Sequence, residues 1–465
     1  MVPERVSVAT GLVCIDALGP GGPYRTRNRQ VITNVAAEPI AELSLVPPLY
    51  VSRAVSAQRK TRPLPVAQRR AGLARAAEAF TTEVIAGLDF PAYAELASQV
   101  SGLPIRVARA AALSTGEAVG AAWDAVQPAQ PAGSALDWRD ESIRRGGAVW
   151  ARRGEVFAVH ASGNSPGVHA LWPQALALGY RVAVRPSRRE PFTAQRLTLA
   201  LQAAGFRPED VTYLPTDHRA ADDIIRSADL AMVYGDQTVV DKYAADPTVF
   251  ANGPGRAKTL ITAEQDWRDH LGVIVDSIAD LAGMACVNTT AVLYEGDPAP
   301  LASAIADRMS TLQPLAATDE RAVLPTVALD KAHALANHLS NKAAGTTPVL
   351  GADQVVADLG DGCAALRPAV HLLTAPDVDT LNIELPFPCV WVSGWSRADG
   401  MTAFRNSLVI NAFTDDEDLI DDLLAEPTVS NVYCGHHRSY YEAPGIPHDG
   451  FLADFLMRNK GFVRD

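Results

Sequence analysis

The chain has 465 residues, which is too long for one compact core and favours two or three domains. Hydrophobic residues make up 48% and charged residues 20%, which excludes a disordered chain, and the net charge of −12 argues against a uniformly basic nucleic-acid surface. No apolar run approaches the ~20 residues that span a bilayer. The N-terminal sequence lacks the basic and apolar regions of a signal peptide, so we expect none.

The five cysteines are widely scattered, and their spacing matches neither a disulfide framework nor a zinc site. They are Cys14, Cys286, Cys363, Cys389 and Cys434. We therefore expect no structural metal and a location in a reducing cytoplasm.

The first third of the chain predicts short strands followed by helices. Residues 1–60 carry a turn signal at 19–23 with strand candidates on either side. Residues 66–126 repeat alanine, leucine and arginine at helical spacing, which predicts three helices, and residues 127–133 form a linker. Residues 143–153 place a Gly-Gly turn between two short arms. This pattern is typical of a β-ribbon, which is either an oligomer contact or an ordinary surface hairpin.

From residue 154 onward, short apolar strands alternate with helices. The expected strands are 155–160, 181–184, 211–214 and 230–234, and the expected helices are 167–178, 193–204, 219–226 and 238–245. This alternation predicts parallel βαβ units in a doubly wound, Rossmann-type sheet. Ligands bind such sheets beyond the carboxyl ends of the strands. The loops 161–166, 185–191, 215–218 and 235–238 are therefore the candidate binding loops.

A second α/β domain follows a junction near residues 252–262. Its expected elements are a helix at 267–281, strands at 290–294, 370–373 and 390–392, and helices at 299–312 and 331–342. Residues 431–435 and 448–456 predict a strand and an amphipathic helix that complete a domain or an interface.

Cys286 is the candidate nucleophile of this second domain. It follows a Gly-Met-Ala turn, between the helix at 267–281 and a strand-like run at 289–294. This layout can direct a thiol into a cleft, where a lowered pKa would make the thiolate a strong nucleophile. The alternative is a buried core cysteine, because free cysteine is among the most buried residue types.

Two loops of the first sheet carry candidate binding groups. Asn164 lies between a glycine and Ser-Pro just before a helix, where its amide can donate to an oxyanion or simply cap the helix. Arg185, Ser187 and Arg188 follow a strand, where they can hold a phosphate or form a solvated turn.

Four segments, in order, resemble the aldehyde dehydrogenase superfamily over about residues 60–440. Gly163-Asn164-Ser165-Pro166 resembles its Trp-Asn-Phe-Pro loop, and Val184-Arg185-Pro186-Ser187 resembles its Lys-Pro-Ser/Ala turn. Gly283-Met-Ala-Cys286 resembles its Gly-Gln-x-Cys nucleophile loop. Glu384-Leu-Pro-Phe387-Pro388 is a looser match to its Glu-x-Phe-Gly-Pro segment, and Glu384 is otherwise a surface carboxylate before a turn.

The resemblance implies a nicotinamide cofactor and assigns roles to matching residues. Cys286 becomes the nucleophile, Asn164 the oxyanion donor, and Glu384 a contact to the cofactor ribose beside Phe387. Gly235 is expected to allow close approach of the cofactor. Where many NAD-using members carry a ribose-binding glutamate, this chain has Arg188, which favours the 2′-phosphate of NADPH over NADH.

The junction departs from the typical family pattern. Family members carry Glu-Leu-Gly-Gly-Lys there, and the glutamate activates the deacylating water, whereas residues 251–258 read Ala-Asn-Gly-Pro-Gly-Arg-Ala-Lys. Gly-Pro-Gly-Arg-x-Lys is similar to the junction of acyl-CoA reductases of the bacterial luminescence type. Without the carboxylate, an acyl-cysteine has no evident route to hydrolysis.

The sequence therefore predicts an NADPH-dependent reductase. It would reduce an acyl-CoA, carrier thioester or acyl adenylate to an aldehyde through an S-acyl-cysteine. The alternatives are an NAD(P)-dependent aldehyde dehydrogenase with a base from elsewhere, and a non-catalytic Rossmann-type binding protein. The resemblance also implies a separate acid-activating enzyme as a partner.

The expected architecture is an aldehyde-dehydrogenase-like α/β fold with three parts. Residues 1–128 and 151–258 form the cofactor domain, residues 259–425 the catalytic domain, and residues 129–150 and 426–465 an oligomerisation arm. We expect a homo-oligomer, with neither nucleic acid nor a membrane as a partner.

Overall fold

The apolar runs after residue 154 form a mostly parallel, seven-stranded sheet in the computed structural model, which describes residues 12–443 and 445–464. Its order is β12-β11-β8-β9-β10-β2-β3, and the pairs from β12 to β10 are parallel. The parallel strands are β8 (Val156–His160), β9 (Arg181–Arg185), β10 (Val211–Tyr213), β11 (Leu230–Tyr234) and β12 (Val249–Asn252). The four predicted strands and the doubly wound order are thus confirmed. The order reverses between β8 and β11, so the binding crevice of such a sheet lies beyond these two strands.

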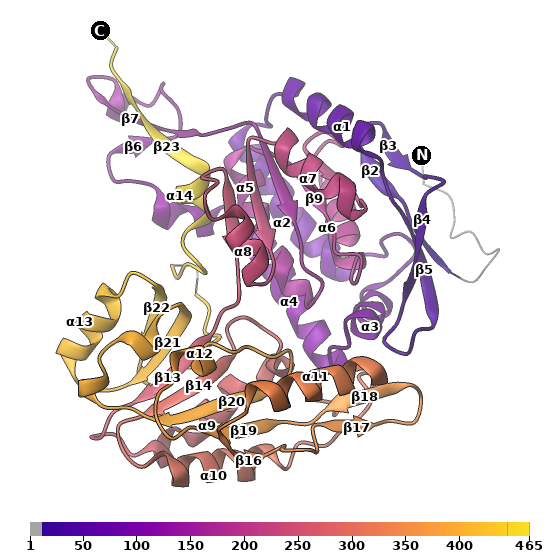
Figure 1. Cartoon of the computed structure of the whole chain (residues 1–465). Helices are drawn as coiled ribbons and strands as arrows, with labels where there is room; N and C mark the ends of the chain where they lie inside the picture. The colour runs from indigo at the N-terminus through magenta and orange to yellow at the C-terminus, as the bar shows by residue number, and fades with distance from the viewer. Residues whose placement is uncertain (1–11, 444, 465) are drawn as a thin grey trace.

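Helices cover both faces of this sheet (Figure 1). The three helices predicted in residues 66–126 are α2 (Val66–Thr82), α3 (Phe90–Ser101) and α4 (Ile105–Ala121). The connections contain α6 (Phe192–Ala203), α7 (His218–Ser227) and α8 (Gln237–Tyr243), while α1 (Pro48–Lys60) was not predicted. The helix expected at 167–178 is instead η3 (Pro166–His169) and α5 (Pro173–Leu178). Pro173 lacks a backbone N–H, so it starts a new helix and does not continue one.

The N-terminal strands lie at the edge of the first lobe, and two of them flank the predicted turn at 19–23. β2 (Ala17–Gly19) and β3 (Gly22–Tyr24) form a hairpin at the edge of the large sheet. β1 (Val13–Ile15), β5 (Pro39–Ser44) and β4 (Arg29–Thr33) form a separate three-stranded sheet.

The second lobe contains another seven-stranded sheet, with the order β16-β19-β20-β14-β13-β21-β22. Its strands are β13 (Ala257–Ile261), β14 (Thr289–Tyr294), β16 (Thr347–Leu350), β19 (Ala369–Leu372), β20 (Cys389–Gly394), β21 (Ser407–Phe413) and β22 (Val429–Cys434). The accompanying helices are α9 (Trp267–Ala279), α10 (Pro298–Met309), α11 (Leu329–Lys342), α12 (Val378–Leu381) and α13 (Glu417–Ala425). A small antiparallel sheet, β15 (Thr326–Ala328), β18 (Cys363–Leu366) and β17 (Val356–Asp358), adjoins α11.

The predicted arm differs from the structure in two respects. The expected ribbon at 143–153 is not a hairpin: η2 (Glu141–Ile143) precedes β7 (Gly147–Arg152), which pairs with β23 (Met457–Phe462) and β6 (Ser134–Ala135). In addition, β22 pairs in parallel with β21, so it belongs to the second sheet and not to the arm. Both strands pair with partners that local sequence does not reveal.

The C-terminal segment connects the two lobes. After β22 it leaves the second lobe, passes to α14 (Leu452–Leu456) beside the first lobe, and ends in β23 of the arm (Figure 1). Within the described residues, no helix combines the length and the apolar character that crossing a bilayer requires.

Candidate functional site

The nucleophile loop begins with strained backbone. After α9, the residues Leu281, Ala282 and Gly283 have φ values of 56°, 62° and 61°. This left-handed region costs about 1 kcal/mol or more for each residue with a side chain. Such strain persists only where the surrounding structure enforces it, and here it precedes Cys286 by a few residues.

Asn288 fixes the shape of this loop. Its Oδ1 accepts from the backbone N–H of Ala285 at 2.9 Å. Its Nδ2 donates to the carbonyls of Ser277 at 3.0 Å and Asp280 at 2.8 Å. One buried side chain thus links the end of α9 to the turn that carries Cys286, which restricts where the thiol can lie.

Asn164 lies against the same loop from the first lobe. The Ser162 hydroxyl donates to its Oδ1, and this bond turns the amide nitrogen the other way. The amide Nδ2 makes a long 3.4 Å bond to the carbonyl oxygen of Met284, two residues before the cysteine. The structure therefore brings Asn164 and Cys286, which are far apart in sequence, to one place.

His448 contacts the thiol and was not predicted as a site residue. Its Nε2 lies 3.3 Å from Cys286 Sγ, and its Nδ1 lies 2.8 Å from Asp449 Oδ2. Asn431 of β22 anchors this segment, because its Nδ2 donates to the His448 carbonyl at 2.6 Å. The only sequence signal is the dipeptide His-Asp between Pro447 and Gly450, and it does not indicate which residue the imidazole meets.

Charge around the thiol favours a protonated His448. Partial removal from water opposes protonation, but the negative charges of the Cys286 thiolate and Asp449 outweigh it and raise the pKa of His448 well above its usual value. Tyr234, at the end of β11, faces the same charges. Burial, Cys286 and Asp449 all raise the pKa of its phenol, which therefore stays neutral.

The junction between the lobes packs directly on the nucleophile loop. A Cβ on Gly255 would lie 1.6 Å from the Cys286 carbonyl oxygen, so the position requires glycine. The next residue, Arg256, has a φ of 49°, and its N–H donates to Glu384 Oε2 at 3.1 Å. Burial raises the pKa of the Glu384 carboxyl, although hydrogen bonds from the backbone N–H groups of Arg256 and Gly255 oppose this shift.

Gly255→Ala is expected to displace the nucleophile loop. The added methyl cannot fit, and overpacking of this kind costs about 1–3 kcal/mol. We expect a lower urea midpoint together with slower alkylation of Cys286. Gly272→Ala is the matched control, because a Cβ there meets nothing within 4 Å. Normal stability and normal alkylation in Gly255→Ala would contradict this packing.

Lys258 of the junction is held in place by three hydrogen bonds within the second lobe. Its Nζ donates to Ser407 Oγ at 2.6 Å, Asn382 Oδ1 at 2.9 Å and the Arg405 carbonyl at 3.1 Å. Burial, followed by the charge of Arg256, lowers its pKa to about 7. Lys258 thus connects β13 to the start of β21 and to the segment that precedes Glu384.

Three predicted cofactor residues lie at the end of β9 and in the loop that follows it, and each contacts a different neighbour. Arg185 ends β9, and its Nε donates to Thr216 Oγ1 at 2.9 Å. The Ser187 hydroxyl accepts from the Arg189 N–H at 3.1 Å and abuts the Gly163 backbone, where a Cβ would approach it to 2.5 Å. The Arg188 side chain is half-buried, and its Nη1 donates to Gln30 Oε1 of β4 at 3.1 Å.

Gly235 and Phe387 have packing roles in the structure. A Cβ on Gly235 would meet Val239 of α8 at 2.5 Å, so the glycine allows this helix to approach β11. Phe387 is 1% exposed in the core of the second lobe. A Cβ on Gly283 would lie 2.8 Å from the Phe387 carbonyl carbon and 2.4 Å from Pro388, so this segment supports the nucleophile loop.

The strand ends fit a nucleotide cofactor. Three buried atoms lack a hydrogen-bond partner among the described residues: His160 Nε2 and Asn252 Oδ1 at the ends of β8 and β12, and Arg256 Nε just before β13. Burial, followed by the charge of Arg185, lowers the pKa of His160 to about 3, so its imidazole stays neutral. Unpaired donors and acceptors beside clustered cations match the phosphates and hydroxyls of NAD(P).

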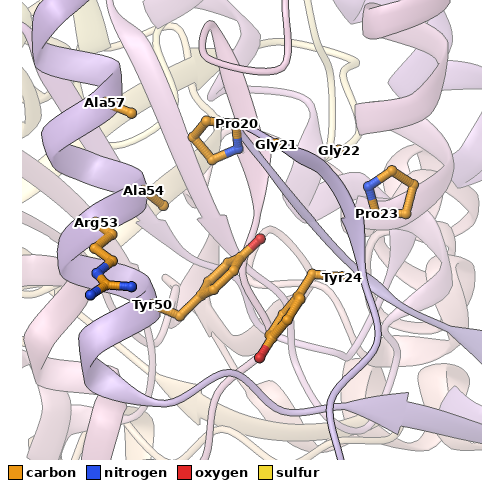
Figure 2. Close-up of a pocket in the computed structure, with 9 residues that line it drawn as sticks. All are labelled: Pro20, Gly21, Gly22, Pro23, Tyr24, Tyr50, Arg53, Ala54 and Ala57. Carbon is orange, nitrogen blue, oxygen red and sulfur yellow. The ribbon is translucent and has the colours of Figure 1, made fainter.

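A separate hollow of about 320 Å³ lies at the edge of the first lobe. It is lined by the β2–β3 turn and α1, where Tyr24 stacks on Tyr50 with ring centroids 4.5 Å apart (Figure 2). None of its lining residues belongs to the site around Cys286. It therefore does not contribute to that chemistry.

Comparisons with known proteins identify the fold. The model of the aldehyde dehydrogenase family matches residues 28–459. Aldehyde dehydrogenase 21 from Physcomitrella patens, solved with the reaction product succinate, is 15% identical, with a TM-score of 0.80 and coverage of 97% of this chain and 98% of that chain. No curated protein sequence matches the chain significantly.

Two further solved structures are similar over nearly their full length, and both are complexes. A 3,6-anhydro-L-galactose dehydrogenase in complex with NAP is 17% identical, with a TM-score of 0.80 and coverage of 97% and 99% of the two chains. An indole-3-acetaldehyde dehydrogenase complexed with NAD+ is 15% identical, with a TM-score of 0.80 and coverage of 96% of each chain.

Proposed function

The chain belongs to the aldehyde dehydrogenase family, and from that premise we propose that it oxidises an aldehyde to a carboxylic acid with NAD(P), through a thioester on Cys286. The observation that carries the proposal is the contact of Cys286 with the His448 imidazole, beside the Asn164 amide. The sequence favoured acyl reduction because no base was evident near the thiol. The His448 imidazole supports the alternative prediction, an aldehyde dehydrogenase whose base lies outside the junction.

Each site residue has a distinct role in the proposed reaction. The Cys286 thiolate attacks the aldehyde carbon and forms a C–S bond. The Asn164 Nδ2 and the Cys286 backbone N–H stabilise the resulting oxyanion. When bound, NAD(P) accepts hydride from this carbon, with Arg185, Ser187 and Arg188 expected to hold its ribose and phosphates and Glu384 its nicotinamide ribose. Water then releases the acid from the thioester.

Reduction of an activated acyl group by NADPH is the second candidate. It is favoured by the junction, where residues 251–258 contain no carboxylate side chain. In this case the acyl group enters as a CoA thioester, carrier thioester or adenylate, which a separate enzyme would supply. The same cysteine carries the acyl group in both reactions.

Incubation with aldehydes and NAD(P)+, with and without CoA, separates the two candidates. Aldehyde oxidation predicts NAD(P)H and free acid without CoA. Acyl reduction predicts that the oxidative direction requires CoA and yields acyl-CoA, and that acyl-CoA plus NADPH yields aldehyde. Absence of acid without CoA would contradict the proposed function.

Arg188 is expected to set the preference for the phosphorylated cofactor. A charge-assisted hydrogen bond to the 2′-phosphate contributes about 1.5–3 kcal/mol, so Arg188→Glu should lower kcat/KM for NADP by about 10–100-fold. The rate with NAD is the internal control, because a folding defect lowers both. An unchanged ratio of the two kcat/KM values would show that Arg188 does not contact this phosphate.

The arm of β6, β7 and β23 is proposed as an oligomer contact. It projects from the first lobe in Figure 1 and offers a short sheet with the exposed strand β23. Light scattering of the full chain measures the assembly directly.

A further inference from the structure

We infer that His448, held by Asp449, is the general base that activates the water releasing the acid from Cys286. This inference rests on the proposed function and assigns a residue to the step that the family's junction glutamate performs elsewhere. It requires an imidazole beside the thiol, a partner that orients its ring, and access for water.

The geometry meets the first two requirements. Nε2 faces the Cys286 sulfur at 3.3 Å, and Nδ1 faces Asp449 Oδ2 at 2.8 Å, so the ring lies between a nucleophile and a carboxylate. A base oriented by a third group in this way is the recurring arrangement of nucleophilic catalysis. The Asn431 bond to the His448 carbonyl at 2.6 Å fixes the segment to the second sheet.

Partial exposure meets the third requirement. The His448 side chain is 24% exposed and that of Asp449 is 27% exposed. A water molecule can therefore reach the ring, and a proton can leave it. A sealed imidazole would not exchange protons with solvent at each turnover.

The charge of the thiol explains how one imidazole serves both halves of the reaction. When Cys286 is ionised, its charge and that of Asp449 outweigh the burial that lowers the pKa of His448 and raise this pKa, so the imidazolium stabilises the sulfur 3.3 Å away. Acylation converts the thiolate to a neutral thioester and removes one of these charges. The pKa of His448 then falls, and the ring becomes a base at the stage that needs one. The phenol of Tyr234, which is neutral, also faces this pair.

The steps balance in atoms and charge. After hydride leaves the thiohemiacetal, His448 loses its proton to solvent. The neutral Nε2 then takes a proton from water while the water oxygen bonds to the thioester carbon. Collapse of the tetrahedral intermediate breaks the C–S bond, and the thiolate leaves. The acid loses its proton to solvent, and the imidazolium again faces the thiolate.

The test is His448→Gln in the full-length enzyme. Steady-state kcat should fall by about 10²–10⁴-fold, the usual contribution of a general base. At a pH high enough to ionise the thiol without help, one equivalent of NAD(P)H per site should still appear in a burst. Intact mass should then show an acyl adduct on Cys286. Hydroxylamine, which attacks thioesters without a base, should restore turnover.

Three further variants refine the test. His437→Gln changes an exposed histidine of the same C-terminal stretch and should leave kcat unchanged. Asp449→Asn removes a charge that raises the pKa of His448, so the rise of kcat with pH should move to lower pH while kcat falls. Glu384→Gln should retain the pH profile, whereas loss of turnover with a retained burst would assign the base to Glu384 and overturn the inference.

The remaining outcomes are distinguishable. If wild-type enzyme yields NAD(P)H and acid and His448→Gln turns over within a few-fold of it, only the inference is overturned. The same holds if burst and turnover are lost together at every pH, because His448 would then serve acylation alone. If wild-type enzyme oxidises no aldehyde, the proposed function fails before the variants are compared.

Discussion

Replacing Cys286 with alanine is expected to lower aldehyde oxidation by at least about 10⁴-fold, because the thiol forms the covalent intermediate in every step of the proposal. The variant should also form no acyl adduct with aldehyde and NAD(P)+, or with acyl-CoA. Initial rates and intact mass measure the two effects. Folding should be preserved, because the Cys286 side chain is partly exposed and its thiol contacts the His448 imidazole, which is itself partly exposed.

The other cysteines provide the controls. Cys434 of β22 is also partly buried, and burial raises the pKa of its thiol. Burial likewise raises the pKa of Cys363, to about 11, and that of Cys389. Cys434→Ala should therefore keep full activity, and iodoacetamide should modify Cys286 first. Equal labelling of Cys286 and Cys434, with no turnover by the wild-type protein, would support a non-catalytic binding protein, whereas activity retained in Cys286→Ala would show that another residue is the nucleophile.

Replacing Asn164 with alanine is expected to reduce kcat by about 10²–10³-fold, the usual effect of removing one oxyanion donor. The amide nitrogen points toward the nucleophile loop because the Ser162 hydroxyl occupies the opposite oxygen. Binding of the cofactor should change little, since the donor acts on charge that develops during the reaction. Comparison of kcat with the dissociation constant of NAD(P)H tests this separation.

Asn164→Asp and Ser162→Ala refine the assignment. Aspartate has nearly the same shape but places a negative charge beside the oxyanion, so it should be at least as damaging as alanine. Ser162→Ala leaves the amide free to rotate and should cause a smaller loss. If Asn164→Asp retained kcat, the residue would be a helix or loop cap and not an oxyanion donor.

The site was partly predictable because some of its parts are contiguous in sequence. The helix, the glycine turn, Cys286 and the following strand occupy neighbouring positions, so local patterns identify the loop. The strands β8, β9 and β11 were predicted from their apolar residues, and the rule for doubly wound sheets then places Asn164 and Arg185 at their carboxyl ends. The same reasoning could not show that Phe387 is buried in the core or that Gly235 packs on α8.

The sequence by itself determined the two α/β lobes, the doubly wound order and the nucleophile loop, because periodic apolar residues and turn residues act on neighbours along the chain. Only the tertiary structure decided that β23 pairs with β7, that Gly255 abuts Cys286, and that His448 meets a thiol 162 positions away. These contacts depend on how whole lobes pack, and no local pattern records them. The base that we propose in place of a junction carboxylate thus lies on a different segment of the chain.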